Sequence, residues 1–303
     1  MPTYFAAISR WVLLLLFSGT SAAQEIVLYD AGLGTPPANQ GWTWLSNPLF
    51  GNQVSQSMEA DAVRLDTSQQ TSDQSGYFIP GHPMAPTLDC DRGFTVSWNV
   101  RILSENHITS HRAGFSVIVV CSDLRALEVG IWTNEVWAQA DMPLFTHAEG
   151  ANLNTTDRTN RYDLLVHGSN YSLRVNGTNR LNGPLRDYSA FSGFPDPYET
   201  PDFIFLGDDT SSADADVHLS RVSVVPWPSS PTLTLSSRFD ESLEFEASGL
   251  SSGYRYHLER SPLLQTPDWT QIQTLDATGN VATVTLPTPS DRPRAYYRLI
   301  YRP

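Results

Sequence analysis

The residues best able to bind a ligand lie between positions 127 and 149, in the stretch LEVGIWTNEVWAQADMPLFTHAE. Alternate residues of a β-strand point to the same side, so this stretch predicts shared faces for two sets of side chains. They are Glu128 with Trp132, and Glu135 with Trp137 and Gln139, followed by His147 and Glu149 at a similar step of two. Tryptophan faces can stack on sugar rings, while carboxylates and amides pair with sugar hydroxyl groups. We therefore predict a carbohydrate-binding surface of Trp132, Trp137, Glu135 and Gln139; the alternative is that both tryptophans fill the core.

The same stretch holds groups that could catalyse glycan cleavage. Glycoside hydrolysis needs two carboxyl groups roughly 5–10 Å apart, and a lyase needs a base. The candidates are Glu128, Glu135 and Glu149, with His147 as a lyase base. Serine-hydrolase elbows, His-Glu-x-x-His motifs, phosphate loops and Cys/His zinc spacings are all missing from the sequence. We therefore favour a non-catalytic binding protein, with a glycoside hydrolase or polysaccharide lyase as the alternative.

A cluster of four aspartates lies between positions 208 and 216. Asp208, Asp209, Asp214 and Asp216 fall within nine residues. Calcium takes about six to eight oxygen ligands, which acidic loops and backbone carbonyls supply readily. A structural calcium site is one prediction. The other is a solvated acidic turn in which Asp209 caps its own backbone. The sequence indicates no other cofactor.

Short β-strands must position all these residues. Runs rich in Val, Ile, Phe, Tyr and Trp are separated by Gly, Pro, Asn and Asp, and no long window has helical periodicity. We predict strands near 26–29, 42–45, 53–58, 61–66, 76–79, 94–103, 112–121, 126–132, 135–139, 161–167, 170–175, 178–182, 202–207 and 216–225. Segments 30–41, 141–160 and 187–201 are predicted as loops. Six further strands follow near 232–236, 242–247, 253–260, 269–275, 280–286 and 295–301.

The two cysteines, Cys90 and Cys121, pose a question of register. The runs 94–101 and 114–121 resemble a hairpin around 104–111, in which Phe94 faces Cys121 and Trp98 faces Val117. This register puts apolar pairs on one face but leaves Cys90 upstream of the turn at 91–93. A disulfide would need the chain to fold back there, so we expect two separately buried thiols rather than a disulfide.

The first residues of the chain indicate where the protein is located in the cell. Arg10, the apolar run WVLLLLF and the small residues Ser21-Ala22-Ala23 are typical of an export signal covering residues 1–23; the alternative is a short anchor or buried helix. We predict a secreted, extracellular or periplasmic protein without membrane insertion after signal removal.

All 19 basic residues are arginine, so the chain has no lysine and lysine chemistry is excluded. The formal net charge of −13 argues against a nucleic-acid partner, which needs clustered positive charge.

Two all-β domains follow from the composition. The stretch PWPSSP at 226–231 has three prolines in six residues, so we predict a linker at 227–231 between a large domain at 24–226 and a small one at 231–303. About six short strands at this spacing are typical of a small immunoglobulin-like or fibronectin-like β-sandwich.

Three stretches of the large domain resemble concanavalin A-like (laminin G-like) jelly-roll sandwiches. They are GFTVSWNVRIL with RAGFSVIVV, then RYDLLVHGSNYSLRVNGTNRLNGPLRDYS, and FIFLGDDTSSADADVHLSRVSVV. The small domain, through YRYHLERSPLLQTPDWTQIQTL and YYRL, resembles C-terminal modules of bacterial exported proteins. The resemblance implies that the first and last strands are neighbours, which would add Asp30 to the calcium site. The Glu-x-Asp-x-x-Glu motif of the laminarinase-like branch is absent.

This fold hosts lectins, glycosidases, lyases and adhesion modules. The preferred prediction is therefore an exported protein that binds carbohydrate or another cell-surface component through its large domain. A glycan-active enzyme and a structural cell-surface spacer are the two alternatives.

Overall fold

The computed structural model describes the chain apart from residues 1–24, 47–53, 81, 240, 264–267 and 289–294. The predicted export signal at 1–23 lies outside the described residues. Within the part described, the helices are the short 3-10 turns η1 (Ala31–Leu33), η2 (Pro37–Gln40) and η4 (Pro197–Glu199). None of the helices described there has the length and apolar character needed to cross a bilayer.

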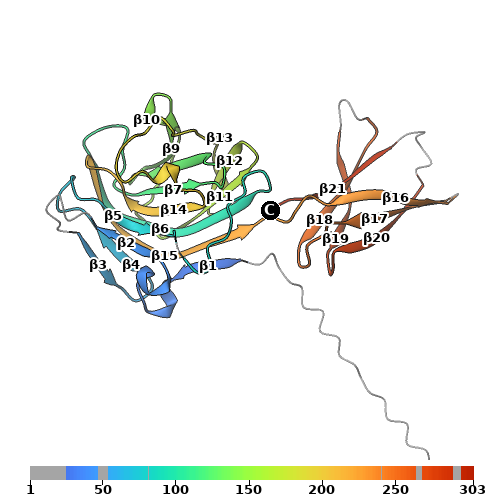
Figure 1. Cartoon of the computed structure of the whole chain (residues 1–303), viewed down its shortest axis with the longest axis horizontal. Coiled ribbons are helices and arrows are strands. Elements are labelled where there is room, and N and C mark those ends of the chain that lie inside the picture. Colours follow the sequence, from blue (N-terminus) through green and yellow to red (C-terminus); the bar gives the residue numbers. More distant parts are fainter. Residues whose placement is uncertain (1–24, 47–53, 81, 240, 264–267, 289–294) are drawn as a thin grey trace, which may run out of the picture.

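Two antiparallel sheets form the larger body in Figure 1. One contains, in spatial order, β13 (Thr178–Pro184), β12 (Asn170–Val175), β11 (Asn160–His167), β6 (Phe94–His107), β15 (Ala213–Pro226), β4 (Val63–Asp66) and β3 (Ser55–Met58), with β1 (Ile26–Asp30) also paired to β15. The other contains β10 (Leu144–Asn152), β9 (Glu135–Asp141), β8 (Ala126–Ile131), β7 (Ser116–Val120), β14 (Phe203–Asp208), β5 (Ser75–Phe78) and β2 (Thr43–Ser46).

The chain crosses repeatedly between the two sheets, from β4 to β5 to β6 to β7 and again from β13 to β14 to β15. This crossing pattern and the strand content confirm the predicted all-β jelly-roll sandwich. Between the sheets lies one apolar core, in which Trp98 and Tyr162 stack with their planes 2° apart. Alternating side chains of each strand fill this core, and the remaining side chains point outward.

The predicted hairpin between residues 94–101 and 114–121 is wrong. β6 pairs with β11 and β15 in the eight-stranded sheet, whereas β7 pairs with β8 and β14 in the other sheet. Both strands do turn the predicted apolar residues inward, Phe94 and Trp98 from β6 and Val117 and Cys121 from the second run. Apolar alternation identifies the inward face, but it does not distinguish a neighbour in one sheet from a residue facing it across the core.

The expectation of two free thiols fails for the same reason. Cys90 and Cys121 form a disulfide, with their Cα atoms 5.8 Å apart. Because β7 lies across the core from β6, the end of β7 meets the segment that leads into β6. The chain therefore needs no fold-back of the kind that the hairpin would have required.

A strand at 144–152 was also missed, since the sequence predicts a loop over 141–160. β10 is an edge strand with register shifts on both sides of His147. Such bulges break the period of two by which strands are recognised. Its residues are half-buried or exposed, so hydrophobic patterning offers little signal there.

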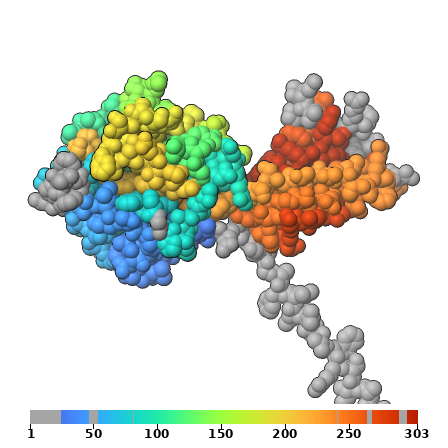
Figure 2. Space-filling model, in the orientation of Figure 1, coloured from blue at the N-terminus to red at the C-terminus, as the bar shows by residue number. Residues whose placement is uncertain are grey.

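The C-terminal part forms a small sandwich with its own core, seen as the orange and red body in Figures 1 and 2. One sheet contains β16 (Thr232–Arg238), β17 (Ser242–Ser248) and β20 (Val281–Pro287); the other contains β19 (Thr270–Asp276), β18 (Arg255–Ser261) and β21 (Tyr296–Tyr301). β15 ends at Pro226, and the Trp227 indole donates to Thr95 Oγ1 over 3.0 Å. The domain boundaries and the immunoglobulin-like class of this sandwich stay predictions.

Candidate functional site

The outward face of the seven-stranded sheet carries the predicted ligand-binding residues. Strand register places its side chains in rows across β14, β7, β8 and β9. One row runs Phe205, Ile118, Glu128; the next runs Gly207, Ser116, Gly130, Trp137. We name residues 185–200 the covering segment. Its side chains Tyr188, Phe191 and Tyr198 pack on the apolar end of this face. This segment corresponds to the yellow atoms in Figure 2.

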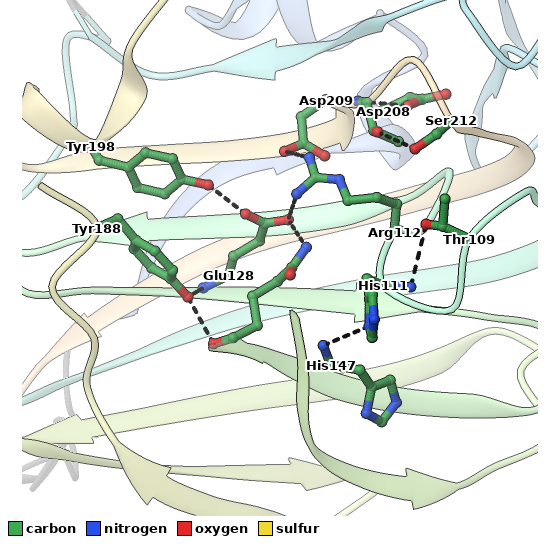
Figure 3. Close-up of polar contacts among 12 residues, drawn as sticks. Thr109, His111, Arg112, Glu128, His147, Tyr188, Tyr198, Asp208, Asp209 and Ser212 are labelled. Carbon is green, nitrogen blue, oxygen red and sulfur yellow. Dashed lines mark hydrogen bonds and ion pairs between the residues drawn. The ribbon is translucent and has the colours of Figure 1, made fainter. Parts of the chain in front are cut away.

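Glu128 lies at the centre of the face and is completely buried, at 0% exposure. Its carboxylate accepts hydrogen bonds from Gln139 Nε2 at 2.8 Å and from the Tyr198 hydroxyl. Figure 3 shows Tyr188 and Tyr198 on one side of Glu128, and Arg112 with Asp209 on the other. Burial, followed by the negative charge of Asp209, raises the pKa of Glu128 to about 7, against the lowering effects of Arg112, Tyr198 and Gln139.

Arg112 precedes β7 and enters the face from the end of the sheet. It donates to Asp209 Oδ2 at 3.0 Å, and its NH1 lies 3.5 Å from Glu128 Oε1. Its guanidinium also lies over the Phe145 ring, 5.0 Å from the centroid. One arginine thus links Glu128 of β8 to Asp209, the residue after β14, and its place in the sequence did not predict this role.

Five buried polar atoms on this face have no hydrogen-bond partner. The atoms are Arg112 NH1, Ser116 Oγ, Trp137 Nε1, Gln139 Oε1 and Asp209 Oδ1. We name the five side chains that carry them the polar cluster. The Trp137 nitrogen lies 3.1 Å from where a Cβ on Gly130 would stand, and Ser116 pairs with Gly130 across the strands. A buried unpaired polar atom costs about 1–3 kcal/mol. Five such atoms on one face make it the candidate site of this protein.

Histidine rings cover the faces of the two predicted tryptophan platforms. Trp137 is 0% exposed, and the His147 ring stacks on it with centroids 4.5 Å apart. Trp132 is nearly buried under His107, at 4.2 Å and 10° between planes. His107 and His147 are 33% and 24% exposed. Both tryptophans lie outside the core between the two sheets, on the predicted outward face, and imidazoles form the accessible surface above them.

The other acidic candidates have separate partners. Glu135 faces His147, with 3.2 Å between its Oε1 and the imidazole Nε2. Glu149 pairs with Arg186 and accepts from the Tyr171 hydroxyl at 3.3 Å, at the side where β10 approaches β13. Of the four catalytic candidates, only Glu135 and His147 contact each other, and Glu128 instead joins the predicted ligand residue Gln139.

The five predicted calcium ligands are held by protein groups. Asp30 pairs with Arg221 at 2.9 Å and Asp216 with Arg64 at 2.6 Å. Asp214 accepts from Asn106, Asp208 from the Thr67 hydroxyl, and Asp209 from Arg112. Among the described residues, the only cluster of three ligand side chains near enough to share an ion is Cys90, Cys121 and Asp123, whose cysteines form the disulfide. The geometry thus lends calcium no support, and the site stays a prediction.

Several residues of the site escaped the sequence analysis. Tyr188 and Tyr198 lie in a segment interrupted by Gly and Pro, where no pattern points to the sheet. Ser116 begins an apolar strand and carries no signal of its own. His107 ends β6 of the eight-stranded sheet and Arg112 follows it. The mistaken hairpin obscured that their side chains reach Trp132 and Glu128 of the other sheet's outward face. Only the strand register reveals them.

Comparison with known proteins gives no family. No family model and no curated protein matches the chain. Among solved structures, a carbohydrate esterase from Shiga toxin-encoding bacteriophage phi24B is similar, with 12% identity, 66% of this chain and 98% of that chain covered, and a TM-score of 0.47. A protein of unknown function with a galectin-like fold from Bacillus subtilis is 11% identical, with 66% of this chain and 96% of that chain covered and a TM-score of 0.43. A family 7 alginate lyase is 12% identical, with 66% of this chain and 92% of that chain covered and a TM-score of 0.37. Such scores carry no argument about ligand or activity.

Proposed function

We propose that this protein binds a neutral carbohydrate at the polar cluster, without cleaving it. The unpaired atoms of the cluster carry this proposal. Arg112 NH1 and Trp137 Nε1 donate, Gln139 Oε1 and Asp209 Oδ1 accept, and Ser116 Oγ does both. Neighbouring hydroxyl groups on a sugar both donate and accept, so they complement this mixture and would replace water with equivalent hydrogen bonds.

The charge around the cluster favours a neutral sugar over a uronic acid. Asp209 and Glu128 both lie beside Arg112 and already share its positive charge. A ligand carboxylate would meet Asp209 Oδ1, which needs a hydrogen-bond donor. The net charge of −13 would also repel a polyanion at long range.

Export is part of the proposal. The disulfide between Cys90 and Cys121 suits an oxidising compartment, as does the predicted signal at 1–23. A sugar-binding face would then meet glycans outside the cytoplasm. Mass determination of the protein recovered from outside the cytoplasm tests this part, since cleavage after Ala23 leaves Gln24 as the first residue.

Binding is tested with neutral gluco-, manno-, xylo- and galacto-oligosaccharides and with uronic-acid oligomers, each with and without calcium. Ser116→Ala is the sharpest variant, because it removes a hydroxyl that has no partner in the protein. We expect it to weaken binding of a neutral oligosaccharide about tenfold, the effect of roughly one hydrogen bond, at unchanged stability.

Ser223→Ala is the matched control. Ser223 is equally buried but lies in the other sheet and donates to Glu25 at 2.6 Å. This variant should lose stability and keep its affinity. Equal affinity of wild type and Ser116→Ala would contradict the proposed site, and silence with every oligosaccharide would favour a structural spacer instead.

An enzyme is the second candidate because of Glu128. A carboxyl group whose pKa is about 7 suits a general acid near neutral pH. Against this, both of its oxygens already accept hydrogen bonds from protein side chains. Measuring released reducing ends and unsaturated sugars in the same binding mixtures tests this candidate; release that Glu128→Gln abolishes would establish it.

A further inference from the structure

Glu128 touches the polar cluster without contributing an unpaired atom to it. Oε1 accepts from Gln139 Nε2 and lies near Arg112, while Oε2 accepts from Tyr198. Its backbone nitrogen donates to the Tyr188 hydroxyl at 3.3 Å. These side-chain partners of Glu128 belong either to the polar cluster or to the covering segment.

The bond to Gln139 decides how that amide is oriented. The two ends of an amide have nearly the same shape but opposite hydrogen-bonding character. An ionised carboxylate can only accept, so it selects Nε2 and leaves Oε1 as the unpaired acceptor. A protonated Glu128 could instead donate to Oε1, and the amide would then present Nε2 to the ligand.

We propose that Glu128 is a positioning residue that makes Gln139 a hydrogen-bond acceptor, so that tight sugar binding requires ionised Glu128. This inference rests on the proposed function. The charged and titratable groups that face Glu128 in the described chain are Arg112 and Asp209 from the end of the sheet and Tyr188 and Tyr198 from the covering segment. Arg112 favours the ionised form, and Asp209 with burial opposes it.

Because of this balance, Glu128 changes between its ionised and protonated forms near neutral pH. Because the pKa of Glu128 is raised to about 7, its carboxyl is mostly ionised at pH 8 and mostly protonated at pH 6. The amide of Gln139 would accordingly be an acceptor at pH 8 and a donor at pH 6. The ligand hydroxyl that it contacts must therefore act as a donor in the tight complex.

The experiment measures the affinity for the tightest-binding neutral oligosaccharide between pH 6 and pH 8.5. Wild type should bind about tenfold more weakly at pH 6 than at pH 8, as expected when roughly one hydrogen bond is lost. Glu128→Gln, a carboxamide of the same shape that does not titrate, should bind with one affinity throughout this pH range. Glu59→Gln, at an exposed position, should keep the response of wild type.

The histidines of the site are unchanged in Glu128→Gln, so any pH response they contribute is common to both proteins. Should this variant fail to fold, the side-chain amide signals of Gln139 in the wild-type ¹H–¹⁵N spectrum give the same answer, because they should move with a midpoint near pH 7. Signals that stay fixed overturn the inference. A variant that binds as tightly as wild type, with the same pH response, overturns it while leaving the proposed function intact. Absence of sugar binding by wild type overturns both.

Discussion

The outward face of the seven-stranded sheet has two halves of opposite character. In one half, Tyr188 and Tyr198 of the covering segment pack on Ile118, Val120 and Phe203, and the tyrosine hydroxyls donate to Gln139 O and Glu128. In the other half, Arg112, Ser116 and Asp209 have buried atoms without a hydrogen-bond partner, and the Arg112 atom has only an ion pair with Glu128. One sheet, with one strand alternation, thus builds a closed apolar cover beside an unsatisfied polar cluster.

This difference separates the groups that stabilise the fold from those on which the proposed function depends. The closed half gains the free energy of buried aromatic rings and satisfied hydroxyl groups. The polar cluster satisfies only part of its hydrogen-bonding groups and places two carboxylates around one guanidinium. Proteins retain groups that cost stability mainly where binding or catalysis needs them. The two halves therefore make opposite predictions for substitutions.

The largest change in stability is expected at Trp137. Its ring is buried, like those of the closed half, but its nitrogen has no hydrogen-bond partner, like the atoms of the polar cluster. Trp137→Ala should lower the free energy of unfolding by about 3–5 kcal/mol and abolish sugar binding. Urea unfolding and oligosaccharide titration measure the two effects. His147→Ala, which removes only the imidazole stacked on this indole, is the control and should cost far less. Unchanged stability in Trp137→Ala would show that the indole is not packed.

The disulfide should affect only stability. It links Cys121, just beyond β7 at the closed half, to Cys90 across a sequence separation of 31. Loss of a cross-link over such a loop costs about 3–4 kcal/mol, so the double variant Cys90→Ser with Cys121→Ser should unfold at lower denaturant concentration. Its affinity for sugar below the unfolding transition should equal that of wild type. A parallel loss of affinity would contradict the separation of the two halves.

The sequence was a better guide to the closed architecture than to the polar cluster. Alternation identified the inward residues of β6 and β7, such as Trp98 and Val117, and it found Glu128 and Gln139 on one face. It could not assign β6 and β7 to different sheets, because the apolar faces of opposed sheets look like those of paired strands. That error carried over to the cysteines.

The polar cluster depends on contacts that strand periodicity does not encode. Arg112 and Asp209 are 97 residues apart and meet only because β7 and β14 are neighbours. Tyr198 reaches Glu128 from a loop-like segment 70 residues away. For Trp137, the spacing gave the correct face, but not that His147 would cover the ring.

Glu128 should make the protein more stable in mild acid. Its folded-state pKa of about 7 lies above its ordinary value of 4.5, so between these values the folded state holds a proton that the unfolded state releases. Stability therefore rises as pH falls from 8 to 5, by about 2–3 kcal/mol if Glu128 acts alone. Glu128→Gln should lack this gain and be more stable than wild type at pH 8. Equal pH profiles of the two unfolding free energies would contradict the assignment.

The smallest effect should come from Tyr198→Phe, which keeps the aromatic ring of the cover and removes only its hydroxyl. Because that hydroxyl donates to the Glu128 carboxylate, its loss should cost about 1–2 kcal/mol at pH 8. The cost should shrink at pH 5, where a protonated Glu128 depends less on a donor. Affinity for sugar at pH 8 should fall, because loss of this donor raises the pKa of Glu128 and leaves less of its carboxyl ionised. Unfolding and binding measured at both pH values check this, and an affinity at pH 8 equal to that of wild type would contradict the dependence of binding on ionised Glu128.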